Sequence, residues 1–83
     1  MRYCLRIEVS LKPGHSDPEG ETTAKSLRDL RYKVEEARVV KVYEITFNAN
    51  SLLEAGRQAE EMCRRLLANP VKDDYRYDVV EAE

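Results

Sequence analysis

Alternation of apolar and polar residues over positions 3–11 constrains this chain more than any other feature. In the stretch YCLRIEVSL, the residues at odd positions are apolar and most of those at even positions are polar. Side chains of a β-strand point alternately to opposite faces, so the pattern predicts a strand that buries one face only. A fold built on this strand needs an apolar layer against that face, while its opposite face stays polar.

The segment KPGHSDPEG, residues 12–20, ends that strand and leads into a helix. It contains two prolines and two glycines, which favour a loop. Asp17 can cap the free N–H groups of a helix, and Pro18 suits the first helical position. We expect this helix to continue to about residue 31. Its inward residues would be Ala24, Leu27 and Leu30.

Residues 37–48, ARVVKVYEITFN, are rich in β-branched and aromatic side chains and predict a long strand. Tyr43, Ile45 and Phe47 share one face, whereas Val40 and Val42 lie on the opposite face. This change of phase indicates either a β-bulge or a strand that is buried on both faces in this half. We favour the second interpretation, in which the strand packs against two different surfaces along its length.

A second helix after residue 51 gives the strongest periodic signal in the chain. Ser51 and Glu54 have the spacing of a capping box, and Asn69-Pro70 ends the helix because proline cannot continue it. Arg64 and Arg65 would lie in the last turn, where cations complement the helix dipole. The apolar positions have the spacing of one helix face: Leu52, Ala55, Gly56, Ala59, Met62, Cys63 and Leu66.

A final alternating segment, residues 74–81, predicts a third strand with Tyr75, Tyr77 and Val79 on one face. The order is then β-α-β-α-β within one domain, residues 1–83. Because each strand has a polar face, we expect both helices to cover the same face of the sheet. The predicted fold class is α+β: a small two-layer sandwich with some ferredoxin-like character.

The core available to such a domain is small. The chain has 83 residues with one Phe and no Trp, and 36% of its residues are charged. A chain of this size buries only about 60–65% of its unfolded surface. Shared burial with a partner would stabilise it, and the open edges of a small sheet favour pairing with another chain. We therefore expect a homodimer, or a higher oligomer, with the sheet extended or intertwined across the subunits.

Charge and composition exclude several classes of protein. The net charge is −2 with the two signs interspersed, so no basic face is expected for nucleic acid. No apolar run approaches the roughly 20 residues of a membrane-spanning helix, and no signal-peptide pattern opens the sequence. Two cysteines far apart do not form a disulfide framework. We expect a cytoplasmic protein with reduced thiols.

The candidate catalytic residues have simpler structural explanations. His15, Asp17 and Glu19 alternate in one loop, but Asp17 is better explained as a helix cap and Glu19 as a partner of the helix dipole. Cys63 falls on the apolar face of the second helix, where cysteines pack as small hydrophobes. The loop also lacks the GxxxxGK[ST] and GxGxxG spacings of phosphate-binding loops. We expect no catalytic, cofactor-binding or metal-binding residue.

Four stretches of the sequence are distinctive: LKPGHSDPEG, SLRDLRY, ARVVKVYEITF and, most specifically, EEMCRRLLANPVKDDYRYDV. They resemble the PurS family, the small subunit of phosphoribosylformylglycinamidine (FGAM) synthase. They cover nearly the whole chain in the right order. The sequence departs from the family at Val40, where a glycine often precedes the lysine of the central strand.

The resemblance implies an assembly role in de novo purine biosynthesis. FGAM synthase is a ligase that converts formylglycinamide ribonucleotide to its amidine with ATP and with ammonia released from glutamine. By resemblance, a PurL synthetase subunit binds ATP and Mg²⁺, and a PurQ glutaminase subunit supplies the ammonia. PurS-like dimers help to dock these two subunits and bind no cofactor themselves. Holding ammonia production next to its acceptor gives the advantage of a positioned reactant.

Seven residues are expected at the dimer or subunit interface: Arg38, Val40, Lys41, Val42, Asn69, Tyr75 and Tyr77. An alternative function is a ferredoxin-like or ACT-type regulatory module, which would bind a small ligand at the loop after the first strand. An acylphosphatase-like enzyme is disfavoured, because the chain lacks an arginine-bearing phosphate loop.

Overall fold

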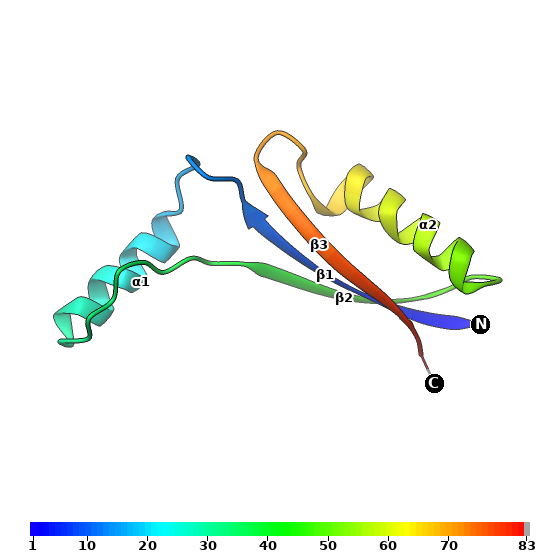
Figure 1. Cartoon of the computed structure of the whole chain (residues 1–83), viewed down its shortest axis with the longest axis horizontal. Coiled ribbons are helices and arrows are strands. Elements are labelled where there is room, and N and C mark those ends of the chain that lie inside the picture. The colour runs from blue at the N-terminus through cyan, green and yellow to red at the C-terminus, as the bar shows by residue number, and fades with distance from the viewer. Residues whose placement is uncertain (83) are drawn as a thin grey trace.

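The computed structural model describes residues 1–82, so Glu83, the last residue of the predicted domain, lies outside the described residues. Within residues 1–82 the order is β-α-β-α-β, as predicted, with a short π-helical segment after the second helix (Figure 1). None of the helices in this range is both long enough and apolar enough to cross a membrane. The elements are β1 (Arg2–Leu11), α1 (Pro18–Asp29), β2 (Lys41–Asn48), α2 (Leu52–Met62), η1 (Cys63–Leu67) and β3 (Asp73–Glu81).

The three strands form one sheet in the order β2-β1-β3, and β1 is antiparallel to both neighbours. Ile7 in the middle of β1 lies opposite Tyr43 of β2 and Tyr77 of β3. Since β2 and β3 both run against β1, they are parallel to each other, and α2 is the crossover that connects them. The α+β fold class is therefore confirmed.

The hydrophobic core lies between one face of this sheet and α2 with η1. Leu5 and Ile7 of β1 are completely buried and pack in one cluster with Ala59 and Cys63. Cys63 is 0% exposed, so its thiol packs as a small hydrophobe, as predicted. Partly buried residues of the outer strands complete the cluster: Tyr43, Ile45, Phe47, Tyr75, Tyr77 and Val79.

The opposite face of the sheet is polar. Even-numbered residues of the three strands point to this face and are exposed or half-buried. Two cross-strand ion pairs lie on it: Arg6–Glu44 at 3.3 Å and Arg76–Glu8 at 3.0 Å. Exposed ion pairs add little to stability. Because its side chains are polar or charged and in contact with solvent, this face of the sheet needs no second helical layer.

Residues 12–40 form an arm that carries α1 beyond one end of the sheet (Figure 1). The prediction that both helices cover the same face of the sheet is therefore wrong for α1. Its apolar stripe is too narrow to cover a sheet. Ala24 is buried, but Leu30, which was predicted to face inward, is 68% exposed.

The arm gives the chain an elongated shape. Its radius of gyration is 16.5 Å and its principal extents are 52 × 29 × 13 Å. A compact domain of this length has a radius of gyration of about 12 Å. The larger radius of gyration of this chain arises because the arm packs mainly against itself, and much of its surface does not contact the sheet.

Asp17 joins two parts of the arm through hydrogen bonds to its carboxylate. One carboxylate oxygen accepts the N–H of Gly20 at 2.9 Å and so caps α1, as predicted. The other accepts the N–H of Val39 at 3.0 Å and so ties the returning strand segment to the start of the helix. Gly20 is buried beside Ala37, and a Cβ at this position would lie 2.5 Å from the Ala37 carbonyl oxygen. Only glycine permits this close approach.

The strand β2 begins at Lys41, four residues later than predicted. Residues 37–40 are not part of the sheet, because they run along α1 and Val39 donates its N–H to Asp17. The pairing of β1 with β2 is continuous from Arg2 opposite Asn48 to Val9 opposite Lys41. This continuous register excludes the β-bulge that was one interpretation of the change of phase.

The second helix begins as predicted and ends differently. The Ser51 hydroxyl accepts the N–H of Glu54 at 3.2 Å, and Ala55 and Ala59 are buried. Leu66 was predicted to lie on the same buried face, but it is 82% exposed. The cause is η1: the N–H of Ala68 bonds to the carbonyl of Cys63, at 2.9 Å, and this wider turn rotates the last residues around the helix axis.

A carboxylate on α2 joins the helix to β3. Glu60 accepts a hydrogen bond from the Tyr75 hydroxyl at 2.8 Å, and the Tyr75 ring stacks on Tyr77 with centroids 6.4 Å apart. Hydrogen bonding from the two tyrosines holds the pKa of Glu60 below its usual value. The same carboxylate, together with burial, raises the pKa of Tyr77 to about 12. This cluster fixes the position of α2 along the sheet.

Replacing Gly20 with alanine tests the packing of the arm. Gly20→Ala places a methyl group against a backbone carbonyl, and we expect a loss of about 1–3 kcal/mol in the free energy of unfolding. Gly56→Ala is the matched control: nothing lies within 4 Å of its added Cβ, so we expect a gain of up to about 1 kcal/mol from helix propensity. Urea unfolding followed by circular dichroism measures both. Equal effects of the two substitutions would show that the arm does not pack as described.

Replacing Tyr75 with phenylalanine tests the joint between α2 and β3. The pKa of Glu60 is lowered in the fold, so its bond with Tyr75 stabilises fully above the pKa of an unfolded glutamate, about 4.3. This stabilisation is lost as the pH falls through the lower pKa of the folded state. We expect Tyr75→Phe to lower the Tm by a few degrees at pH 7, with the difference closing below pH 4. Tyr43→Phe, a partly buried control whose hydroxyl has no hydrogen bond in the described chain, should show no such pH dependence.

Candidate assembly surfaces

The residues considered for catalysis make structural contacts. His15 is exposed in its loop, and Asp17 binds two backbone N–H groups, first that of Val39, which lower the pKa of its carboxyl. Burial, with a smaller effect of Glu60, raises the pKa of the Cys63 thiol, which disfavours a reactive thiolate. No group of three or more potential metal ligands comes together within residues 1–82.

The outer edge of β2 is the first candidate assembly surface. In the order β2-β1-β3, β2 has a neighbour on one side only, and Lys41 at its start lies opposite Val9. Val40 and Val42 are 42% and 43% exposed. Residues 38–48 contain no proline, one of the residues that block an edge strand. An interface at Val40, Lys41 and Val42 stays a prediction, and their exposure leaves them free for one.

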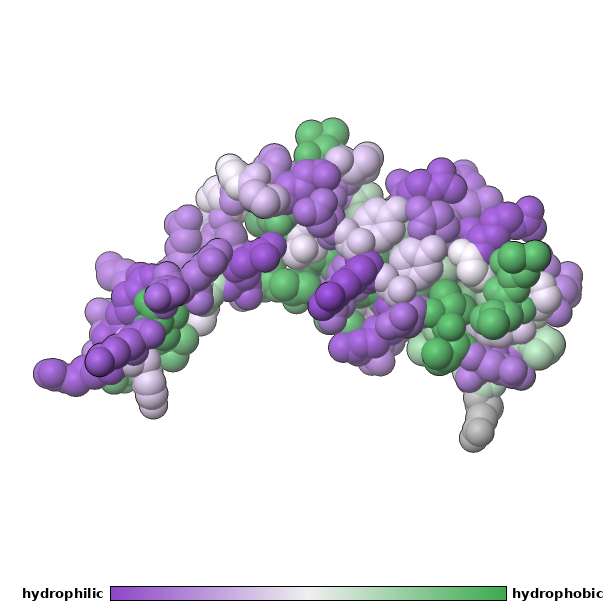
Figure 2. Space-filling model, viewed as in Figure 1, coloured by the Kyte–Doolittle hydropathy of each residue, from purple (hydrophilic) through white to green (hydrophobic). Residues whose placement is uncertain are grey.

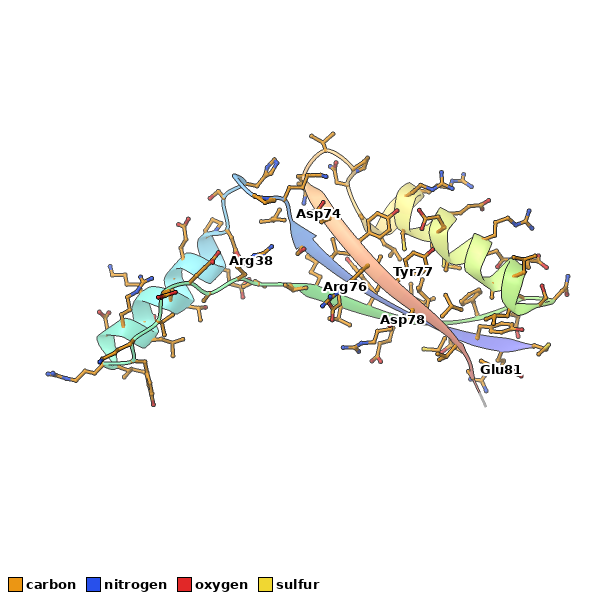
Figure 3. The ribbon with its side chains drawn as sticks, in the orientation of Figure 1. Arg38, Asp74, Arg76, Tyr77, Asp78 and Glu81 are labelled. Carbon is orange, nitrogen blue, oxygen red and sulfur yellow. The ribbon has the colours of Figure 1, made fainter. Side chains whose placement is uncertain are left out.

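Arg38 lies at the root of the arm, where it has an internal role. Its guanidinium donates to the carbonyl of Leu11 at 3.1 Å and so ties the arm to the end of β1. Figure 3 shows Arg38 on the arm, with Asp74, Arg76 and Asp78 spaced along β3. A shallow groove of about 340 Å³ lies between these elements, and Arg38, Asp74 and Arg76 line it. Arg38 therefore stabilises the position of the arm within the chain. A contact with another chain would use the guanidinium N–H groups that do not bond to Leu11.

Asn69 also has an internal role. Its side-chain oxygen accepts the N–H of Val71 at 2.9 Å, and its own N–H donates to the Asp73 carboxylate at 2.9 Å. The N–H of Asp73 returns to the Asn69 carbonyl at 2.8 Å. These bonds fix the turn between η1 and β3. They show why asparagine is useful here without reference to a partner.

Tyr75 and Tyr77 are partly buried on the face that α2 covers. Hydrogen bonds from their hydroxyls lower the pKa of Glu60, and their rings pack at the margin of the hydrophobic core. The structure thus brings the two tyrosines together with each other on β3, the edge strand at the opposite side of the sheet from β2. Their predicted place at an interface stays a prediction.

The most exposed large hydrophobic side chains are ones that the sequence analysis did not assign to an interface. Leu53, Leu66 and Val71 are 87%, 82% and 78% exposed. Leu53 and Val71 fall outside the helical and strand periodicities, which is itself a signal of exposure. For Leu66 the sequence carries no such signal, because a π-helical turn does not show in the apolar pattern.

Comparisons with known proteins agree with the resemblance in the sequence. The chain matches the model of the PurS family, phosphoribosylformylglycinamidine (FGAM) synthase, over residues 4–81. The PurS subunit of this synthase from Archaeoglobus fulgidus is 49% identical over 70 residues, covering 83% of this chain and 88% of the relative. The one from Methanothermobacter thermautotrophicus is 36% identical over 83 residues, covering 100% and 99%.

Solved structures show the same fold. Thermus thermophilus PurS superposes with a TM-score of 0.88 at 43% identity, covering 100% of both chains. A chain in the structure of PurLQS from Thermotoga maritima superposes with a TM-score of 0.86 at 26% identity, covering 96% of this chain and 99% of that one. The family model spans nearly the whole sequence, and the relatives match over most of their own length. This chain therefore belongs to the PurS family of FGAM synthase subunits.

Proposed function

We propose that this chain is the non-catalytic small subunit of FGAM synthase, a dimeric scaffold that docks a PurQ-type glutaminase onto a PurL-type synthetase for ammonia transfer. Family membership supports the enzyme, and the structure of PurLQS from Thermotoga maritima supports the two partners. ATP and Mg²⁺ would bind to the synthetase and not to this chain. The observation that carries the proposal is the long, open edge of β2, which can pair with another chain.

The proposed dimer joins two copies through β2. An exposed edge strand carries a row of N–H and C=O groups that can pair with another chain. Here β2 is preceded by residues 37–40, which lie outside the sheet, and Val40 and Val42 are exposed. A two-fold axis beside β2 would bring the same segment of a second copy alongside and cover these valines in both. The arms would then be placed against the partner.

The docking role follows from what coupling requires. Ammonia released by a glutaminase reaches its acceptor efficiently only if the two active sites are held in a fixed relation. An elongated chain of 52 Å can contact two larger subunits at once, which a compact domain of the same length would do less well. Rigidity matters as much as reach. The hydrogen bonds of Asp17 and Arg38 make the arm rigid where it joins the sheet.

Replacing Val40 with aspartate tests this proposal. In the proposed dimer the substitution buries an unpaired charge, which costs several kcal/mol. We expect dissociation to monomers and at least about a tenfold loss of glutamine-dependent FGAM synthesis in the reconstituted complex. Synthesis from added ammonium should be retained, because the synthetase chemistry is untouched. Light scattering and the two activity assays measure these effects.

Leu53→Asp is the matched control, because Leu53 is even more exposed and lies on α2, away from the β2 edge. It should keep both the dimer and the glutamine-dependent activity. A stable Val40→Asp dimer that still couples both reactions would contradict the proposed dimer. A wild-type chain that binds neither larger subunit but gains thermal stability with an amino acid or nucleotide would instead support the regulatory module.

A further inference from the structure

The backbone bonds of Met1 show which groups of β2 point to its open edge. The N–H of Ala49 donates to the Met1 carbonyl at 3.0 Å, and the Met1 amino group donates to the Ala49 carbonyl at 3.2 Å. In an antiparallel ladder, pairs that exchange both bonds alternate with pairs that exchange none. The register continues from this pair, so the odd residues of β2 bond to β1. The N–H and C=O groups of its even residues, Val42 to Asn48, therefore point to the open edge.

The bonds between β1 and β3 agree with this assignment. The N–H of Ala82 donates to the Arg2 carbonyl at 2.8 Å, and the N–H of Lys12 donates to the Lys72 carbonyl at 2.7 Å. The even residues of β1 thus bond to β3, which leaves its odd residues to bond to β2.

The two residues before β2 continue this alternation. Val39, an odd residue, donates its N–H to Asp17 within the chain at 3.0 Å. Val40, an even residue, makes no hydrogen bond within residues 1–82. Val39 lines a cavity with Val9 on the face that α2 covers. Val40 lines the groove beside Ser10 on the polar face, so the open edge extends beyond β2 to Val40.

Two-fold symmetry limits how a second copy can pair with this edge. Residues directly opposite each other point to the same face, so the axis passes at one residue of the edge. An axis at Lys41 or at Glu44 sets two like charges directly opposite each other, which destabilises the pair. An axis nearer the arm sets the end of β2 opposite the bend of the arm, and an axis nearer α2 leaves Val40 opposite residues beyond β2. Val42 and Tyr43 are the remaining positions.

The exposed valines favour one of these two positions. With the axis at Tyr43, Val42 would lie opposite the partner's Glu44. Val40 would lie opposite the partner's Thr46, so neither valine would be directly opposite an apolar side chain. With the axis at Val42, the two copies of this residue lie directly opposite each other, and each Val40 is diagonal to the partner's Val42. Val40 and Val42 are 42% and 43% exposed in one copy, and burial of apolar surface favours the axis at Val42.

The face that α2 covers is compatible with this axis. Val39, which is 39% exposed, then lies opposite the partner's Ile45, a residue packed against the core. The apolar layer under α2 continues in this way from one copy to the other. Figure 2 shows hydrophobic surface where the arm meets β2, which this pairing would cover.

Arg38 supplies a charge that distinguishes the two positions. It lines the groove on the polar face of the sheet. With the axis at Val42, it is diagonal to the partner's Glu44, within reach of a long side chain of opposite charge. With the axis at Tyr43, its nearest neighbours across the edge are uncharged. Charge complementarity therefore also selects the axis at Val42.

We propose that two copies of this chain pair along residues 38–46 with the two-fold axis at Val42, and that residues 38–40 join the sheet only in this dimer. This inference rests on the proposed function, because it gives the register of the dimer that the function requires. It also accounts for the late start of β2. The β-branched residues before Lys41 predict a strand, but a single copy offers their outward backbone groups no partner strand.

Disulfide trapping tests the register in a Cys4→Ser chain, whose remaining native thiol, Cys63, is buried. Val40→Cys and Glu44→Cys are oxidised separately and after joint refolding. In the proposed register, residues 40 and 44 of the two copies are directly opposite, with Cα atoms about 5.5 Å apart, which a disulfide can span. Within either single variant the two cysteines are roughly 14 Å apart along the edge. We expect the mixture to form disulfide-linked dimers at least about tenfold faster than either variant alone.

Val40→Cys mixed with Thr46→Cys is the matched control, because these positions are directly opposite only if the axis lies at Tyr43. Faster linking in the control mixture would overturn the proposed register. Equal linking in all samples of a protein that light scattering shows to be dimeric would also overturn it, and either result would leave the scaffold function intact. A chain that stays monomeric and does not support glutamine-dependent FGAM synthesis with the larger subunits would instead contradict the proposed function itself.

Discussion

The burial that α2 can provide is the constraint on which the rest of this structure depends. One helix covers one face of a three-stranded sheet, with Leu5, Ile7, Ala59 and Cys63 at the centre of the contact. No second helix is available for the other face, because α1 has too few apolar residues and lies on the arm. The open face is accordingly polar, and the surface left for association lies at the sheet edge, on the arm and at the end of α2. A chain of this size gains stability from sharing such surfaces.

Local signals predicted most of the fold, since they act between residues close in sequence. The alternation in β1, the cap at Asp17 and the cap at Ser51 each depend on neighbours within a few positions, and each is confirmed. The position of α1 was not predictable in this way. Its apolar residues gave a face but not the surface that this face covers, and close packing of Gly20 on Ala37 keeps the helix beside its own return strand. The continuous register of β2 likewise becomes known only with its partner strand.

The candidate surfaces were predictable only in part. The phase change selected Val40 and Val42 as residues that pack against a second surface; both are exposed in the single chain, so this packing stays a prediction. Arg38 and Asn69 were selected as contact residues, yet each makes hydrogen bonds within the chain that explain it without a partner. Leu66 was assigned to the core because apolar periodicity assumes a constant number of residues per turn, and η1 changes that number. Backbone geometry of this kind has no signature in the sequence of apolar residues.

Hydrogen bonds of the polar side chains stabilise the shape of this chain, and its exposed apolar side chains are available for contact with other proteins. The central claim is that the edge of β2 pairs with a second copy. Hydrogen exchange of the amides in residues 38–48, measured by mass spectrometry over a dilution series, tests it most directly. The account predicts that this segment is protected at high protein concentration and exchanges faster on dilution, in step with loss of the dimer, while β1 stays protected. Exchange of residues 38–48 that is fast at every concentration, in a protein that remains dimeric, would contradict it.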